Sequence, residues 1–173
     1  MKALIAIESS CDDTAAAVII DGKVRANIVS SQLKHSAHGG VVPELASRLH
    51  TEAIVPVVNE ALQTAGIQCA DLNAVAYTNG PGLLGALLVG SSFAKAFALG
   101  LGIPIIAVNH MHGHLLSVFG ADETPHFPFL ALTVSGGHTQ LAIVHDYLEH
   151  EILGSTSDDA AGEAFDKIGR MLD

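Results

Sequence analysis

The fold of this chain is decided by its first segment, residues 2–22, which reads KALIAIESSCDDTAAAVIIDG. An apolar run ends at Glu8, and after a polar turn a second apolar run covers residues 14–20. Asp21-Gly22 is a strong signal for a two-residue hairpin. The segment therefore predicts two antiparallel strands, and the pattern continues into a third strand over residues 24–32.

Helices and strands alternate through the next eighty residues. Pro43 suits the first turn of a helix, and apolar residues then recur at helical spacing until Gly66. Residues 72–78 and 104–108 are predicted as strands, the second of them buried. The apolar stretch 83–99 is predicted as a buried helix, since two serines and a lysine interrupt it and a strand pattern precedes it. This order predicts a mixed sheet with helices on both faces.

The order of strands and helix that opens the chain begins again roughly 125 residues later, which indicates an internal repeat. Strands are predicted over residues 129–134, 139–144 and 149–155. A helix is then expected to open at Asp158-Asp159, with apolar residues recurring at helical spacing after it. The chain therefore reads as one structural unit followed by the beginning of a second copy.

Residues 121–128 contain polar side chains and prolines between two patterned regions, which is typical of a linker. We therefore expect two domains: a lobe over residues 1–120 and the start of a second lobe over residues 129–173. The second set of elements stops inside its first helix. We expect the sequence to be a fragment of a longer protein whose two lobes form a clamp.

Composition narrows the classes of function. The chain has 8 Lys and Arg against 18 Asp and Glu, a formal net charge of −10, so it is poorly suited to holding a nucleic acid by itself. Cys11 and Cys69 are too few for a disulfide framework and suit a reducing cytoplasm. The first residues do not resemble a signal peptide, because Glu8 ends the short apolar run.

The segment His110-Met111-His112-Gly113-His114 is the strongest candidate for a chemical site. Histidines four residues apart lie on one face of a helix, which lets His110 and His114 offer two imidazoles to one metal ion. His112 lies about 200° around the helix from either and is expected to face elsewhere. The alternative is one buried and one solvated histidine. No His-Glu-x-x-His motif is present, so the metalloprotease arrangement is absent.

Two polar turns allow both a structural and a functional interpretation. Asp12 and Asp13 lie in the turn Ser9–Asp13, which is either a plain hairpin loop or a polar centre suited to a hydrated magnesium ion. The turn Gly80-Pro81-Gly82 either only precedes a helix or offers backbone N–H groups to an anion.

The turn Ser135–Thr139 has the same ambiguity, and its small residues and hydroxyls fit a hairpin that grips phosphate. Asp158 and Asp159 are candidates for capping the last helix, whereas Asp166 lies too far along it to cap. The remaining histidines are expected on the surface or in loops: His35, His38, His50, His126, His145 and His150.

Six segments of the chain together resemble the universal tRNA threonylcarbamoyladenosine transferase family, called TsaD in bacteria and once labelled a sialoglycoprotein endopeptidase or glycoprotease. The resemblance runs the length of this chain and covers the N-terminal half of a family member. It implies an α/β fold of the actin-like, sugar-kinase and heat-shock-chaperone type (a duplicated RNase H-like fold), with the first lobe complete and the second truncated. The matching segments are Ile7–Thr14, Gly39–Arg48, Gly80–Leu83, His110–His114, Val134–Thr139 and Asp158–Lys167.

The resemblance also implies a reaction, in which a threonylcarbamoyl group passes from threonylcarbamoyl-adenylate to N6 of the adenine next to the anticodon in tRNA (t6A synthesis). In this acyl transfer an amine attacks a carbonyl that a phosphate leaving group activates. His110 and His114 would hold one divalent metal ion, iron or zinc. The family's third ligand is an aspartate beyond residue 173, and a magnesium ion could accompany a nucleotide.

The family's other site residues can be placed in the same way. The residues that would hold the phosphate and acyl portion of the substrate are Val134, Ser135, Gly136, Gly137 and His138. Asp166 would bind the nucleoside end. Asp12 and Asp13 would flank the reaction centre as a base or proton acceptor, although many relatives have Glu at the position of Asp13.

Family members work with partners: in bacteria a shorter paralogue, TsaB, and a small ATPase, TsaE. We expect tRNA to be held by that complex, without a membrane, and the fragment alone to be inactive. The alternatives are a non-catalytic partner of the same complex, which would lack the paired histidines, and a metallo-glycoprotease, which would need a positioned base. A sugar kinase would need sugar-binding insertions that this sequence does not show.

Overall fold

The structure, a computed structural model, describes residues 1–32, 40–121 and 123–172. His35 and His38, which we expect in a loop, lie outside the described residues. The chain divides into two compact units, Met1–His110 and Met111–Asp173. This division lies ten residues before the predicted lobe boundary at residue 120, so the histidine motif stands at the junction between the units.

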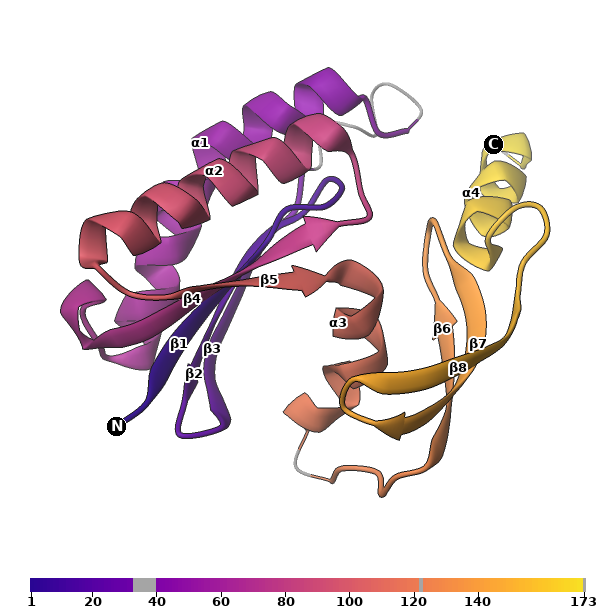
Figure 1. The fold of residues 1–173 in the computed structure, drawn as a ribbon. Coiled ribbons are helices and arrows are strands. Elements are labelled where there is room, and N and C mark those ends of the chain that lie inside the picture. Colours follow the sequence, from indigo (N-terminus) through magenta and orange to yellow (C-terminus); the bar gives the residue numbers. More distant parts are fainter. Residues whose placement is uncertain (33–39, 122, 173) are drawn as a thin grey trace. The chain divides into compact units, whose positions relative to one another are not determined.

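The first unit is built on a five-stranded sheet of order β3-β2-β1-β4-β5 (Figure 1). β1 pairs antiparallel with β2, and β2 with β3, while β1, β4 and β5 are parallel. The predicted meander is therefore confirmed. The elements are β1 (Ala3–Glu8), β2 (Thr14–Ile20), β3 (Lys23–Ser30), α1 (Pro43–Ala65), the 3-10 helix η2 (Cys69–Asp71), β4 (Leu72–Gly80), α2 (Leu84–Leu101) and β5 (Ile105–Asn109).

Turn and cap residues set the ends of these elements as predicted. Asp21 and Gly22 both have positive φ, 49° and 80°, which matches the twist that a two-residue hairpin requires. Gly66 ends α1 and Gly102 ends α2, both in the left-handed conformation in which glycine is unstrained. α2 continues two residues past the predicted end at residue 99, so Gly100 lies inside it.

Both long helices cover the same face of the sheet, contrary to the prediction of helices on both faces (Figure 1). Ile5, Val18 and Val75 face α1 and α2 and are completely buried. Their neighbours along the strands, such as Leu4 and Ile19, are only half-buried. The strands are apolar on both faces, which led to the prediction, but the described residues of this unit supply helices for one face only.

α2 and β5 are more exposed than predicted. α2 buries only a stripe of small residues, Ala86, Gly90, Ala94 and Ala98, which lets its backbone lie close to the sheet. Its two phenylalanines pack partly buried against the core, whereas Leu84 and Leu99 are 74% and 83% exposed. β5 is the edge strand, which leaves its isoleucines partly exposed. Among the described residues, α2 is the one helix whose length and apolar composition would suffice to cross a membrane.

The second unit contains a three-stranded antiparallel sheet of order β6-β7-β8. The element order of the chain's beginning is repeated, because three antiparallel strands are again followed by a helix. Leu115 packs against Ala142 and Val144 to form a small core. The elements from the junction onward are α3 (His110–Leu116), the 3-10 helix η3 (Ser117–Gly120), β6 (Phe129–Val134), β7 (Thr139–Asp146), β8 (Glu149–Ser155) and α4 (Ala161–Met171).

Candidate functional site

A hydrogen-bonded cluster forms at the carboxyl edge of the parallel strands in the first unit. Because β1, β4 and β5 are parallel, their carboxyl ends meet at one edge of the sheet. Glu8 ends β1, Thr78 lies near the end of β4, and His110 follows β5 directly. The Nδ1 atom of His110 lies 3.2 Å from Glu8 Oε2 and 3.2 Å from Ser10 Oγ. One predicted metal-binding histidine is therefore held by a carboxylate.

The Glu8 carboxylate is itself fixed by two further donors. The backbone N–H of Ser10 donates to Oε1, and the Thr78 hydroxyl donates to Oε2. Burial alone would raise the pKa of Glu8, but the hydrogen bonds from His110, Ser10 and Thr78 outweigh it and lower the pKa to about 2. Glu8 is therefore ionised at neutral pH and accepts every one of these hydrogen bonds.

Helix α3 carries both His110 and His114, four positions apart on one short element, as predicted. Among the residues that the structure describes, no three His, Cys, Asp or Glu side chains are grouped so that they could hold a metal ion. Two imidazoles, one of them supported by a carboxylate, are nevertheless chemically suited to iron or zinc. The metal site stays a prediction.

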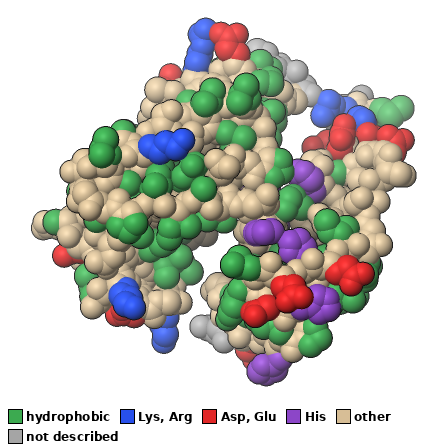
Figure 2. Space-filling view, viewed as in Figure 1, with side chains coloured by type: hydrophobic (Ala, Val, Ile, Leu, Met, Phe, Trp, Pro, Cys, Tyr) green, Lys and Arg blue, Asp and Glu red, His purple; other side chains and the backbone are tan. Residues whose placement is uncertain are grey.

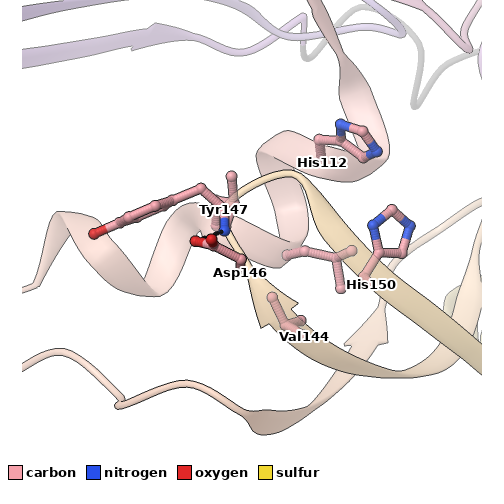
Figure 3. A pocket seen from close by; sticks show the side chains of 7 residues that line it. His112, Val144, Asp146, Tyr147 and His150 are labelled. Carbon is pink, nitrogen blue, oxygen red and sulfur yellow. Dashed lines mark hydrogen bonds between the residues drawn. The ribbon is translucent and has the colours of Figure 1, made fainter.

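His112, which we expected to face elsewhere, packs its ring against His150 of β8 (Figure 3). The ring centroids are 4.9 Å apart and the rings are almost perpendicular. His150 is therefore half-buried in a strand and not a free surface residue. The depression that both histidines line, together with Val144, Asp146 and Tyr147, has no room for a water molecule. His112 has a packing role in this unit.

The loop Ser9–Asp13, which carries the candidate carboxylates, is fastened to α2 and to the turn before it. The Ser9 hydroxyl is 1% exposed and donates to the carbonyl of Ala86 at 3.0 Å. The Leu83 N–H donates to the carbonyl of Ser10 at 2.7 Å. A Cβ at Gly82 would lie 2.5 Å from that same carbonyl oxygen. These contacts favour the structural interpretation of the Gly80–Gly82 turn.

His50 also fastens this loop, and the prediction that it lies on the surface or in a loop is wrong. It is completely buried on α1. Its Nδ1 lies 2.7 Å from the Thr14 hydroxyl, and its Nε2 lies 3.0 Å from the carbonyl of Cys11. Because a carbonyl only accepts, Nε2 carries the proton and the Thr14 hydroxyl donates to Nδ1. His126 and His145, by contrast, are exposed as predicted.

Two carboxylates and a thiol follow these anchors at the loop's tip. Asp12 is half-buried and Asp13 is exposed, so both lie where a ligand could reach them. Partial burial of the sulfur, followed by the neighbouring Asp12 carboxylate, raises the pKa of the Cys11 thiol to about 11. Cys11 therefore stays a thiol at neutral pH and is a poor nucleophile. The reactive groups of this loop are its carboxylates.

In the second unit, the turn Ser135–His138 is closed by its own hydrogen bonds. The Ser135 N–H donates to the carbonyl of His138 at 2.8 Å, and the His138 N–H donates to the Ser135 hydroxyl at 3.1 Å. A Cβ added at Gly136 or Gly137 would meet nothing within 4 Å, and neither residue has a positive φ. The described structure itself therefore does not require glycine at these two positions.

Helix α4 is docked end-on against this turn. The Ala161 N–H donates to the Thr139 hydroxyl at 2.8 Å, and the Gly162 N–H donates to the carbonyl of Ser135 at 3.2 Å. A Cβ at Gly162 would lie 2.7 Å from that carbonyl oxygen. Glycine is therefore needed here for close packing. The turn and the amino end of the helix together form one candidate ligand surface.

The aspartates before this helix do not cap it, contrary to one interpretation of the sequence. The N-cap residue is Ala160, without a side-chain cap. Asp159 forms an ion pair with Lys167 at 2.7 Å. Asp166 lies in the second turn of α4 and is exposed. Thr139 provides the first helical N–H with the partner that a capping aspartate would have supplied.

The predicted site residues thus fall into two groups, one in each unit. Asp12, Asp13 and His110 lie in the first unit. His114, the segment Val134–His138 and Asp166 lie in the second. Sequence reasoning missed Glu8, which contacts His110, and Thr78, whose hydroxyl donates to Glu8. Each is a polar residue at the carboxyl end of an apolar strand, which marks it as a candidate site residue, but its partner depends on how the strands pair.

Known sequences are similar to this chain over nearly its whole length. The sequence model of the family described as TsaD, tRNA N6-adenosine threonylcarbamoyltransferase, matches residues 23–173. A protein of that name from Cytophaga hutchinsonii is 63% identical over 169 residues, which cover 98% of this chain and 49% of the relative. A second, from Christiangramia forsetii, is 56% identical over 172 residues, covering 98% of this chain and 51% of the relative. The chain spans about half the length of these relatives.

Among solved structures, YeaZ from Pseudomonas aeruginosa superposes with a TM-score of 0.60 at 18% identity, covering 93% of this chain and 73% of that one. ROK hexokinase from Thermus thermophilus superposes with a TM-score of 0.51 at 19% identity, covering 93% and 51%. These similarities confirm the predicted actin-like, sugar-kinase fold. With the family match over most of its residues, this chain belongs to the tRNA N6-adenosine threonylcarbamoyltransferase family.

Proposed function

We propose that this chain is part of an acyltransferase that makes t6A, by transfer of the threonylcarbamoyl group from threonylcarbamoyl-adenylate to N6 of the adenine next to the anticodon. The observation that carries the proposal is the family match over residues 23–173, a range that includes the histidine helix α3, the Ser135–His138 turn and α4. The reaction forms a carbonyl–nitrogen bond, breaks the carbonyl–oxygen bond to the phosphate of AMP, and releases one proton from the amine.

We propose that His110 and His114 hold one divalent metal ion, iron or zinc. The support is the chemistry of the donors: two imidazoles on one helix, one of them backed by an ionised carboxylate. When bound, the metal would orient the adenylate and polarise its oxygens. The third ligand would come from outside the described residues, so this chain alone is expected to bind the metal weakly and to be inactive.

We propose that the turn Ser135–His138, with Val134 before it, holds the phosphate and acyl portion of the adenylate. Gly136 and Gly137 support this assignment, since neither packing nor backbone conformation demands glycine there. A bare backbone allows a ligand oxygen to approach N–H groups closely. Asp166, exposed on the helix docked to this turn, would bind the nucleoside end, where a magnesium ion could accompany a nucleotide.

Asp12 and Asp13 are proposed to take up the proton that the attacking amine loses. A ligand could reach both carboxylates at the tip of the Ser9–Asp13 loop. The neighbouring thiol of Cys11 stays protonated and does not compete for the proton. A carboxylate within hydrogen-bond reach of the amine would act as the general base. The anchoring of Ser9 and Ser10 gives this loop a fixed position from which to do so.

We also propose that the protein acts in the cytoplasm, with a TsaB-like paralogue and a TsaE-like ATPase as partners. A formal charge of −10 leaves tRNA binding to an assembly and not to this chain alone. The face of α1 and α2 supports a protein partner: an open groove of about 500 Å³ there is lined by Ile54, Val55, Leu88 and Phe93. Figure 2 shows hydrophobic side chains over the exposed side of α2.

The test is t6A synthesis by the full-length protein with its partners, unmodified tRNA and the adenylate, followed by mass spectrometry of the nucleosides. His110→Ala and His114→Ala are each expected to lose bound metal and t6A formation. His145→Ala is the matched control, because it removes an exposed histidine from β7. A double variant of His110 and His114 that keeps both metal and activity would overturn the metal assignment.

A further inference from the structure

We infer that Glu8 is a positioning residue that fixes the tautomer of His110 and so makes Nε2 the ring atom that faces a metal ion. The inference concerns the charge and proton arrangement of residues that the structure describes. Only its consequence for metal affinity rests on the proposed function. Glu8 itself would not be a metal ligand, because both of its oxygens are engaged by donors of this chain.

The first step is the direction of the hydrogen bond between the two side chains. Glu8 Oε1 accepts from the Ser10 N–H and Oε2 accepts from the Thr78 hydroxyl, and carboxylate oxygens held in this way act as acceptors. Glu8 Oε2 lies 3.2 Å from His110 Nδ1, so the proton of this contact belongs to the imidazole. The Ser10 hydroxyl, also 3.2 Å from Nδ1, can share the same proton as a second acceptor. A neutral imidazole with its proton on Nδ1 carries its lone pair on Nε2.

The second step is the rigidity of the carboxylate. Glu8 has little freedom to rotate away, because the Ser10 N–H holds Oε1 while the Thr78 hydroxyl holds Oε2. Thr78 is 9% exposed and lies on β4, the strand beside β1. The imidazole is thus oriented by two neighbouring strands of the sheet and not by its own short helix.

The third step is what this arrangement does to a bound metal. Histidine ligands in metal sites typically donate the other ring N–H to a carboxylate, which fixes the tautomer and raises the basicity of the ligating nitrogen. Removing such a partner typically lowers metal affinity by about 10–100-fold. Glu8→Gln should therefore weaken metal binding by about this factor while both histidines remain.

The test begins without metal, on the full-length protein. The protein is labelled with ¹⁵N, and the protonation of each ring nitrogen of His110 is determined by long-range ¹H–¹⁵N NMR, with His110→Ala used to assign the signals. In the neutral ring we expect a protonated Nδ1 and an unprotonated Nε2. A neutral His110 protonated on Nε2 would overturn the inference, whether or not any variant folds.

The variants then test Glu8 itself. Glu8→Gln keeps the shape of the side chain but can donate its amide to Nδ1, so we expect the Nε2–H tautomer to become populated. Thr78→Val removes one support of the carboxylate and should shift the tautomer less. Glu60→Gln, an exposed residue on α1, makes the same chemical change away from the cluster and should leave His110 unchanged. An unaltered tautomer in a folded Glu8→Gln would also overturn the inference.

The consequence is measured with Zn²⁺ by competition against a chromophoric chelator, using the full-length protein. A 10–100-fold loss of affinity in Glu8→Gln, with none in Glu60→Gln, supports the positioning role. Equal affinities would contradict it. If the full-length wild type binds no Zn²⁺ or Fe²⁺ while its His110 tautomer is as expected, the proposed metal function fails and the tautomer assignment stands.

Discussion

Gly90→Ala should destabilise the first unit, because the new methyl group would clash with Ser9, whose hydrogen bond fixes the Ser9–Asp13 loop to α2. A Cβ at Gly90 would lie 2.1 Å from Ser9 Oγ and 3.1 Å from Ser9 Cβ. The hydroxyl must therefore leave the Ala86 carbonyl to which it donates, although Ser9 is 1% exposed. The new methyl group thus overpacks the contact between Ser9 of the Ser9–Asp13 loop and α2, and it breaks a buried hydrogen bond.

The magnitude follows from these two effects. Overpacking a close-packed interface costs about 1–3 kcal/mol. Leaving a buried hydroxyl and carbonyl unpaired costs about 1–3 kcal/mol more. Alanine regains about 0.5–1 kcal/mol, because glycine is the poorer helix former. We expect Gly90→Ala to lower the free energy of unfolding by about 3 kcal/mol, the middle of the range these terms allow.

Gly100→Ala provides a matched control on the same helix. A Cβ there meets nothing within 4 Å, so only the helix preference acts, and we expect stabilisation of about 0.5–1 kcal/mol. Unfolding in urea is followed by far-UV circular dichroism, because the chain has no Trp and α1 and α2, with 23 and 18 residues, dominate its helical signal. Ser9→Gly in the Gly90→Ala background removes the clash and should restore part of the loss. Equal urea midpoints for Gly90→Ala and Gly100→Ala would refute this reasoning.

Three further predictions concern buried or charged groups of the first unit. His50→Ala leaves the Thr14 hydroxyl and the Cys11 carbonyl without their partner, and should lower the free energy of unfolding by about 2–5 kcal/mol in the same urea assay. The pKa of Glu8 falls from 4.5 to about 2 on folding, so its stabilisation is complete above pH 4.5 and is lost as the pH falls toward about 2; acid titration of Glu8→Gln should lack this component. Cys11, with its pKa raised to about 11, should react slowly with iodoacetamide at neutral pH, and Asp12→Asn should speed the reaction, as followed by mass spectrometry.

Local sequence patterns were sufficient to predict the strands and helices of this fold. The strand over residues 14–20 has the predicted bounds, and Gly66 ends α1 as expected. These features depend on short-range chemistry, such as strand periodicity and the left-handed conformation of Gly66. The face of a sheet that helices cover is a tertiary property, and the prediction for that property was wrong.

The same distinction explains what was missed in the candidate site. His50 falls on the apolar stripe of α1, four residues before Ile54 and seven before Val57, so its burial could have been predicted from spacing. The contact of Glu8 with His110 could not have been predicted from spacing, because it depends on the parallel pairing of β1 with β4 and of β4 with β5. The placement of His110 and His114 on one helix was local and was predicted correctly.

The contact between Glu8 and His110 joins residues 102 positions apart. Contacts of such long sequence separation form late in folding, since the loop between them must be closed first. A chain emerging from the ribosome has released β1 and the hairpin long before β5 and α3. The imidazole therefore acquires its fixed proton only when the parallel sheet is complete. Correct ligation at His110 would thus mark a finished first unit, and a metal ion met earlier by the nascent chain would find a histidine without its preset tautomer.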